Sequence, residues 1–166
     1  LAFARANRSA LARRATEVVS DVLHASFETE APIDVHHNFV AREHWGGRDL
    51  YVHRKGAVAV SAGTFALVPG SMGTASYVVE GLGNPESFGS CSHGAGRILT
   101  RTEARKSIGT EALARAMRGV VYPEALARRL VEEAPAAYRD IKEVLEDQRD
   151  LVKKRTRLEP IAVLKG

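Results

Sequence analysis

The sequence separates into segments of different periodicity, and their order restricts the folds open to the chain. Residues 1–27 place apolar side chains on one face of a helix. Pro32 ends this segment, because the residue before a proline avoids helical backbone geometry. Short Val-, Tyr- and Phe-rich stretches separated by glycine follow, and helical patterns return after His93. This order predicts an α+β fold with a central β-rich segment between an N-terminal helix and C-terminal helices.

Each predicted element can be assigned to a range of residues. The buried face of the first helix should consist of Leu11, Ala15, Val18, Val19, Val22 and Leu23. The strands, which together suggest one sheet, are expected within 49–60, 64–70 and 75–81. The later helices are expected within 100–109, 110–119, 123–134 and 137–152, starting near Thr102, Thr110 and Pro123, with an interruption at Pro135. The tail, residues 157–166, has extended character.

Composition places the chain among soluble globular proteins. Its 166 residues, 45% hydrophobic and 27% charged, suffice for a single α+β unit over residues 1–166. No apolar run approaches the roughly 20 residues of a membrane helix, so no membrane partner is expected. Cys91 is the single cysteine, which excludes an internal disulfide and favours a reducing, cytoplasmic location.

Positive charge is concentrated in the second half of the chain. Residues 1–96 contain 8 Lys/Arg and 9 Asp/Glu, whereas residues 97–166 contain 16 and 11. Ion pairs on helical faces account for most of these charges, as in the segments RRLVEE and KEVLEDQRD. Binding of a polyanion remains an open alternative.

Two loops have the residue types of ligand-binding segments. PGSMGTAS, residues 69–76, offers backbone N–H groups and hydroxyls to a phosphate, or is simply a turn between strands. It lacks the lysine of a Walker P-loop. CSHGAGR, residues 91–97, surrounds a histidine with small residues, so that a substrate can approach the imidazole. That loop is either a nucleophile loop with Arg97 near a phosphoryl group, or a turn with a structural histidine.

Two further motifs are rich in histidine or basic residues. In DVHHN, residues 34–38, neighbouring side chains of a strand would point to opposite faces, so either His36 or His37 can reach a given site. One histidine falls short of the three or more ligands that a metal requires, which leaves packing as the alternative. The basic residues of HRKG, residues 53–56, either bind phosphate or lie on an exposed strand edge, where their charge opposes aggregation.

Taken in order, these motifs and several others match one known family. The matching segments are HHNF, HRKGA, VPGSMGTASY, GNPESF, SCSHGAGR, RTEAR, EEAPAAYRDI and the terminal VLKG. In these segments the sequence resembles the RtcB family of GTP-dependent RNA ligases, over essentially all 166 residues. The resemblance implies the C-terminal part of an RtcB-like fold.

The resemblance also implies a reaction. Members join RNA 3′-phosphate or 2′,3′-cyclic phosphate ends to 5′-hydroxyl ends, in tRNA splicing and RNA repair, with GTP and Mn²⁺. A histidine takes GMP from GTP, GMP moves to the RNA 3′-phosphate, and the 5′-hydroxyl displaces it.

Individual positions follow from the same resemblance. His93 matches the nucleophile, and His37, rather than its neighbour, matches a manganese ligand. Lys55 and Arg97 match RNA or phosphate contacts. Nucleotide contacts are implied for Asn38, Pro69, Gly70, Ser71, Met72, Ser76, Gly94, Ala95, Gly96, Tyr138 and Lys165, the last reading the guanine.

The sequence lacks the family's other metal ligands, which lie in an upstream half and comprise an aspartate, a cysteine and two further histidines. The sequence also begins with Leu1 rather than methionine. We therefore expect a C-terminal fragment that is inactive alone and has an upstream half as its partner. The alternatives are a non-catalytic module that binds guanine nucleotide or RNA ends, and a set of basic helices that only dock a partner.

Overall fold

A computed structural model describes residues 2–26 and 33–164 of the chain. By their internal contacts, the residues fall into two compact units, Leu1–Ile33 and Asp34–Gly166. The predicted boundary at Pro32 and the guanine-reading Lys165 lie outside the described residues. The prediction of a single unit over residues 1–166 stays a prediction.

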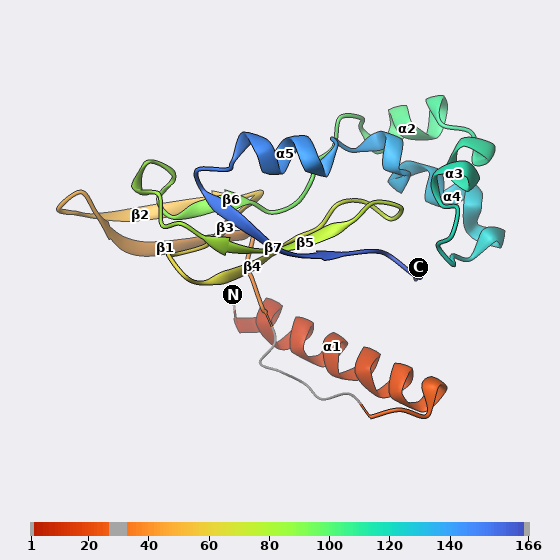
Figure 1. Ribbon diagram of the computed structural model, residues 1–166, viewed down its shortest axis with the longest axis horizontal. Coiled ribbons are helices and arrows are strands. Elements are labelled where there is room, and N and C mark those ends of the chain that lie inside the picture. The colour runs from red at the N-terminus through yellow and green to blue at the C-terminus, as the bar shows by residue number, and fades with distance from the viewer. Residues whose placement is uncertain (1, 27–32, 165–166) are drawn as a thin grey trace. The chain divides into compact units, whose positions relative to one another are not determined.

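The first unit contains one helix among its described residues, α1 (Ala2–Leu23), shown in red and orange in Figure 1. This helix was predicted, but its expected buried face is not buried: Leu11 and Val22 are 62% and 71% exposed, and none of its residues is buried. A helix buries a face only against a second element, and the described part of this unit has none. None of the described helices combines the length and hydropathy that a bilayer-spanning segment requires.

The second unit contains antiparallel strands in three small sheets among its described residues, 34–164. The sheets pair β1 (Asn38–Trp45) with β2 (Arg48–Lys55), β3 (Ala57–Ala59) with β6 (Ser90–Ser92), and β5 (Ser76–Gly81) with both β4 (Phe65–Val68) and β7 (Val152–Leu158). The predicted strands are therefore confirmed, but they do not form one sheet. Gly56 separates β2 from β3 with φ +77°, a conformation that takes the chain out of a regular strand.

The hairpin β1–β2 was only half predicted, because β1 carries charged residues among its apolar ones. Gly46 and Gly47 join the two strands with φ angles of +56° and +74°. Two successive positive φ angles are what the common two-residue hairpin turn requires. The register pairs Asn38 with Lys55, so the end of β2 lies beside the start of β1.

Helices follow β6, as the sequence predicted. They are α2 (Arg101–Ser107), α3 (Thr110–Ala116), α4 (Ala127–Leu130) and α5 (Ile141–Asp147). Short 3₁₀ turns are η1 (Pro85–Ser87), η2 (Glu124–Leu126), η3 (Val131–Glu133) and η4 (Pro135–Ala137).

Several helix boundaries differ from the prediction. The segment 123–134 is divided among η2, α4 and η3, and the last helix begins at Ile141 rather than near residue 137. Thr100, not Thr102, caps α2, since its side chain accepts from the Glu103 N–H while the Glu103 side chain accepts from the Thr100 N–H. The last helix ends at Asp147, although helical periodicity continued to residue 152. Residues from Val152 onward instead pair with β5, and tertiary strand pairing overrides the local preference for helix.

Two clusters form the core of the second unit. One packs the strands against α5, with Val58, Val79, Ile141 and Leu145 almost fully buried. Figure 1 shows α5 running over β3 and β6, while α2, α3 and α4 gather at one end of this unit. The other cluster lies among those helices and includes Leu113, Met117, Leu130, Val131, Ala134 and Met72. Met72 thus attaches the loop after β4 to the helical end.

We expect Leu113→Ala to destabilise the chain by about 2–5 kcal/mol, because it removes a fully buried side chain and leaves a cavity. Urea unfolding followed by circular dichroism measures this free energy. Leu164→Ala, the same change at a position that is 95% exposed, is the control and should alter stability little. Equal effects of the two substitutions would contradict the assigned helical core.

Candidate active site

The two glycine-rich loops of the sequence contact each other directly. Ala95 donates its backbone N–H to the carbonyl oxygen of Pro69 at 2.9 Å. A Cβ atom at Gly94 would lie 2.9 Å from that same oxygen, closer than a real side chain comes. Glycine at this position therefore permits the loop after β6 to pack against the loop after β4.

A pocket of about 410 Å³ opens where these loops meet. Most of the residues that line it were singled out in the sequence. They are Pro69, Gly70, His93, Gly94, Ala95, Gly96, Arg97, Arg101 and Tyr138.

His93 directly follows β6, and its ring is held by the backbone. The Nδ1 atom lies 2.7 Å from the carbonyl oxygen of Gly56. A carbonyl oxygen only accepts hydrogen bonds, so the neutral imidazole carries its proton on Nδ1 and leaves the Nε2 lone pair available. The site therefore presents an unprotonated ring nitrogen beside a cavity.

His36 and His37 of the DVHHN motif were expected to point to opposite faces of a strand, but both precede β1, and their rings nevertheless have different neighbours. The His37 ring stacks on the His93 ring, with centroids 5.3 Å apart and planes 22° apart. The His37 carbonyl oxygen accepts the Gly56 N–H at 2.9 Å. The His36 ring instead lies edge-on to Phe39. His37 is thus the histidine of the motif whose ring contacts His93.

A manganese ion needs more ligands than this part of the protein supplies. Imidazole and carboxylate suit Mn²⁺, but a site needs at least three convergent donors. Within residues 2–26 and 33–164, no group of three or more His, Cys, Asp or Glu side chains is placed to hold a metal ion. Cys91 is buried, and burial raises the pKa of its thiol to about 12, so it stays protonated. The described residues therefore do not form a manganese site by themselves.

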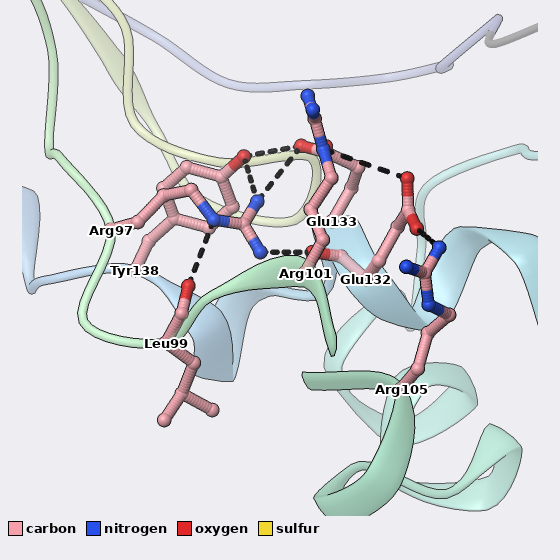
Figure 2. Close-up of polar contacts among 7 residues, drawn as sticks. All are labelled: Arg97, Leu99, Arg101, Arg105, Glu132, Glu133 and Tyr138. Atoms are coloured by element: carbon pink, nitrogen blue, oxygen red, sulfur yellow. Dashed lines mark hydrogen bonds and ion pairs between the residues drawn. The ribbon is translucent and has the colours of Figure 1, made fainter. Parts of the chain in front are cut away.

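Arg97 and Tyr138 form one wall of the pocket and are tied together (Figure 2). The guanidinium donates to the Tyr138 hydroxyl at 3.0 Å and to the carbonyl oxygen of Leu99 at 2.9 Å, and it lies 4.9 Å from the centre of the tyrosine ring. It also donates to the Glu132 carbonyl oxygen. Arg97 was predicted to contact phosphate or RNA, and its guanidinium is already engaged by these protein groups.

Glu133 connects this wall to α2. Its buried carboxylate accepts a hydrogen bond from the Tyr138 hydroxyl and lies 3.4 Å from Arg97 and 3.2 Å from Arg101. Burial is the main reason why the pKa of Tyr138 is raised, and the hydrogen bond to Glu133 adds to it. The tyrosine therefore remains neutral, with its hydroxyl proton donated to Glu133. The Arg101 side chain is 66% exposed, so its guanidinium lies at the rim of the pocket.

The predicted nucleotide loop contains hydrogen bonds between its own residues. The Thr74 hydroxyl oxygen accepts the Ser71 N–H at 2.7 Å, and Gly70 donates its N–H to Ser76 Oγ at 3.4 Å. A Cβ atom at Gly70 would lie 2.3 Å from the Ala75 carbonyl oxygen, so only glycine fits there. Met72 is 7% exposed and packs in the helical core, which leaves only its backbone for a ligand.

The basic HRKG motif divides into a buried and an exposed part. Arg54 is 4% exposed, and its guanidinium contacts both carboxylate oxygens of Glu43 at 2.5 and 2.9 Å. It also donates to Ser90 and to the Phe88 carbonyl oxygen. The interpretation of Arg54 as a phosphate-binding cation or an exposed edge charge is therefore wrong. Lys55 and Asn38 are exposed and paired across the hairpin, outside the residues that line the pocket.

Three residues of the site were missed from the sequence. Gly56 holds the His93 ring through a carbonyl oxygen, which every residue type possesses, and only its place after HRK hinted at a special backbone position. Arg101 and Glu133 read as ordinary helical surface charges, and only the fold brings them to the pocket.

The chain is a mixed α and β protein with a pocket built around a histidine loop. The family model described as tRNA-splicing ligase RtcB matches residues 1–166. The chain therefore belongs to the RtcB family, which confirms the resemblance and the fold class predicted from the sequence.

Relatives with the same family name are similar over most of the chain. RNA-splicing ligase RtcB1 of Escherichia coli strain ATCC 25922 is 39% identical and covers 99% of this chain. RNA-splicing ligase RtcB of strain K12 is 45% identical over 81% of it, and tRNA-splicing ligase RtcB of Pyrococcus furiosus is 35% identical over 99%. The chain spans 41%, 32% and 20% of the lengths of these three relatives, respectively.

The Glu43–Arg54 pair should make stability depend on pH. Hydrogen bonds from Arg54 lower the pKa of Glu43 below its ordinary value of 4.5. A carboxylate with a lowered pKa contributes stability above pH 4.5, and this contribution is lost as the pH falls through the folded-state pKa. We expect Glu43→Gln to be less stable at neutral pH and to lose less stability on acidification, measured by urea unfolding across the acidic range. The exposed Glu86→Gln is the control, and equal pH dependence of wild type and Glu43→Gln would contradict the pairing.

Gly94→Ala should separate the two loops, because the new methyl group has no room beside Pro69. We expect a loss of about 1–3 kcal/mol in unfolding free energy. Gly109→Ala is the matched control, since a Cβ there meets nothing within 4 Å. A stable Gly94→Ala with an unchanged pocket in its crystal structure would contradict the close approach.

Proposed function

We propose that this chain is the histidine-bearing part of an RNA ligase that joins RNA 3′-phosphate or 2′,3′-cyclic phosphate ends to 5′-hydroxyl ends. Membership of the RtcB family and relatives named RNA-splicing ligases support this proposal. The natural setting is tRNA splicing and RNA repair in the cytoplasm. RNA with these ends is the proposed partner.

The observation that carries the proposal is the hydrogen bond between His93 Nδ1 and the Gly56 carbonyl oxygen. It selects the tautomer in which Nε2 is unprotonated, as a nucleophile requires. When Nε2 forms a covalent bond, the ring becomes positively charged, and the carbonyl dipole of Gly56 stabilises the proton that stays on Nδ1. The pocket beside the ring leaves room for the electrophile.

The proposed first step is attack of Nε2 on the α-phosphorus of GTP. The N–P bond forms, the bond from the α-phosphorus to the bridging oxygen breaks, and pyrophosphate leaves with that electron pair. GMP then passes from His93 to the RNA 3′-phosphate, and the 5′-hydroxyl oxygen displaces GMP. A cyclic phosphate is first opened by water.

Other residues would hold the nucleotide. Gly94, Ala95 and Gly96 carry small side chains or none and would leave space for the nucleotide, with Pro69, Gly70 and Tyr138 also lining the pocket. Asn38, Ser71, Met72 and Ser76 are proposed as further contacts, and Lys165 as the residue that reads the guanine. Lys55 and Arg97 are proposed near phosphate or RNA.

The proposal includes manganese, with His37 as one ligand and the remaining ligands from an upstream half. Bound Mn²⁺ would offset charge on the triphosphate. Among the described residues the donor set is incomplete, so the reaction steps above rest on the chain's own groups.

The same incomplete donor set favours a second candidate for the chain alone, a non-catalytic module that binds guanine nucleotide or RNA ends. The two functions differ in what His93 does. In a ligase, loss of the imidazole abolishes sealing while nucleotide binding persists. In a binding module, His93 forms no bond to phosphorus.

Incubation of the complete protein with α-labelled GTP and Mn²⁺ tests the proposal. We expect a covalent, acid-labile adduct that His93→Ala abolishes, with a loss of at least about 10³-fold in the sealing of 3′-phosphate RNA. His44→Ala is the matched control, because that exposed histidine bonds to Asp49 in the hairpin, away from the pocket residues.

Two results would contradict parts of this account. An adduct that persists in His93→Ala would exclude His93 as the nucleophile. Robust labelling of the 166-residue chain without any other polypeptide would refute the need for an upstream half.

A further inference from the structure

Gln148 is the only glutamine of the sequence and is 6% exposed. It follows the last residue of α5, where the chain turns toward β7, and its carbonyl oxygen accepts the Leu151 and Val152 N–H groups. Burial of a primary amide costs free energy unless the amide is hydrogen-bonded. The partners of its side chain therefore indicate what the residue does.

Both ends of the Gln148 amide contact Ser92. Its Oε1 atom accepts the Ser92 backbone N–H at 2.9 Å, and its Nε2 atom donates to Ser92 Oγ at 2.8 Å. A backbone N–H only donates, so this contact fixes which end of the amide is oxygen. One side chain from the end of α5 thus holds both the backbone and the hydroxyl of the residue directly before His93.

The sheet itself holds His93 only loosely. In the β3–β6 pair, Ser92 lies opposite Ala57. The next ladder bond, from the His93 N–H to the Gly56 carbonyl oxygen, is 3.3 Å long, beyond the usual length of about 2.9–3.0 Å. The same oxygen lies 2.7 Å from Nδ1. The short ring contact therefore depends on where the backbone around Ser92 and His93 is held, to which groups outside the β3–β6 pair can contribute.

We propose that Gln148 is a positioning residue for His93. By holding Ser92 on the edge of β6 that faces away from β3, it keeps Nδ1 on the Gly56 carbonyl oxygen and so maintains the tautomer with a free Nε2. Its effect on the ring is independent of the reaction, whereas its catalytic consequence rests on the proposed function.

The tautomer of His93 is the direct test. ¹⁵N-edited NMR of the labelled protein at about pH 8 distinguishes Nδ1–H from Nε2–H in the neutral ring. We expect Nδ1–H alone in the wild type and a mixture of both tautomers in Gln148→Leu, which keeps volume but loses both bonds. Leu113→Ala is the control for general destabilisation, since it weakens the other core cluster and should leave the tautomer unchanged.

Adduct formation provides the second measurement. At saturating GTP, we expect Gln148→Leu to lower the rate of labelling roughly 10- to 100-fold, because the nucleophile is misplaced. The GTP concentration that gives the half-maximal rate should change little, because the substitution does not remove a nucleotide contact. Gln148→Glu should restore most of the rate, because its carboxylate accepts from the Ser92 N–H and hydroxyl alike.

A folded Gln148→Leu with wild-type tautomer and labelling rate would overturn the proposal. If that variant does not fold, Ser92→Ala tests the proposal instead, because it removes only the hydroxyl contact with Gln148. We expect it to lose part of the Nδ1–H tautomer of His93, and an unchanged tautomer would overturn the proposal. Absence of any adduct in the wild type would instead reject the proposed function, and the NMR result would still stand on its own.

Discussion

The Gly56 carbonyl oxygen is the point on which the site depends. It accepts a hydrogen bond from Nδ1 of His93 at 2.7 Å, while the N–H of the same glycine donates to the carbonyl oxygen of His37. One residue between β2 and β3 thus fixes the ring, its tautomer and the neighbouring imidazole. Gly56 has φ +77°, which a residue with a side chain rarely adopts, and a Cβ there would lie 3.6 Å from the His93 ring.

Buried polar groups connect the elements around this point. Arg54 ties the hairpin to the segment before β6 through Ser90 and Phe88, Gln148 ties α5 to Ser92, and Glu133 ties the helical end to Tyr138. Among the described residues, no buried side-chain nitrogen or oxygen lacks a hydrogen-bond partner. A network in which every member is satisfied supports a single arrangement of the loops, since breaking one bond leaves a buried group unpaired.

Much of the fold followed from local patterns. Short stretches rich in Val, Tyr and Phe and separated by glycine predicted β4 and β5, and helical patterns with Pro135 as an interruption predicted the later helices. The errors occurred where distant partners decide the structure. Val152 and the residues after it form a strand rather than a helix, because they pair with β5. The apolar face of α1 was predicted to be buried, but none of its residues is buried. Periodicity shows which face of a helix is apolar and does not show which element covers that face.

The sequence by itself determined the family, the histidine loop and the glycines that border it, because motif residues and their spacing are written along the chain. Only the tertiary structure decided that the loops at Pro69 and Gly94 touch, that Arg54 is buried against Glu43, and that Gln148 holds Ser92. These pairs join residues far apart in sequence or use backbone groups common to all residues. Such contacts carry no local pattern, and they exist only once the strands and α5 have packed.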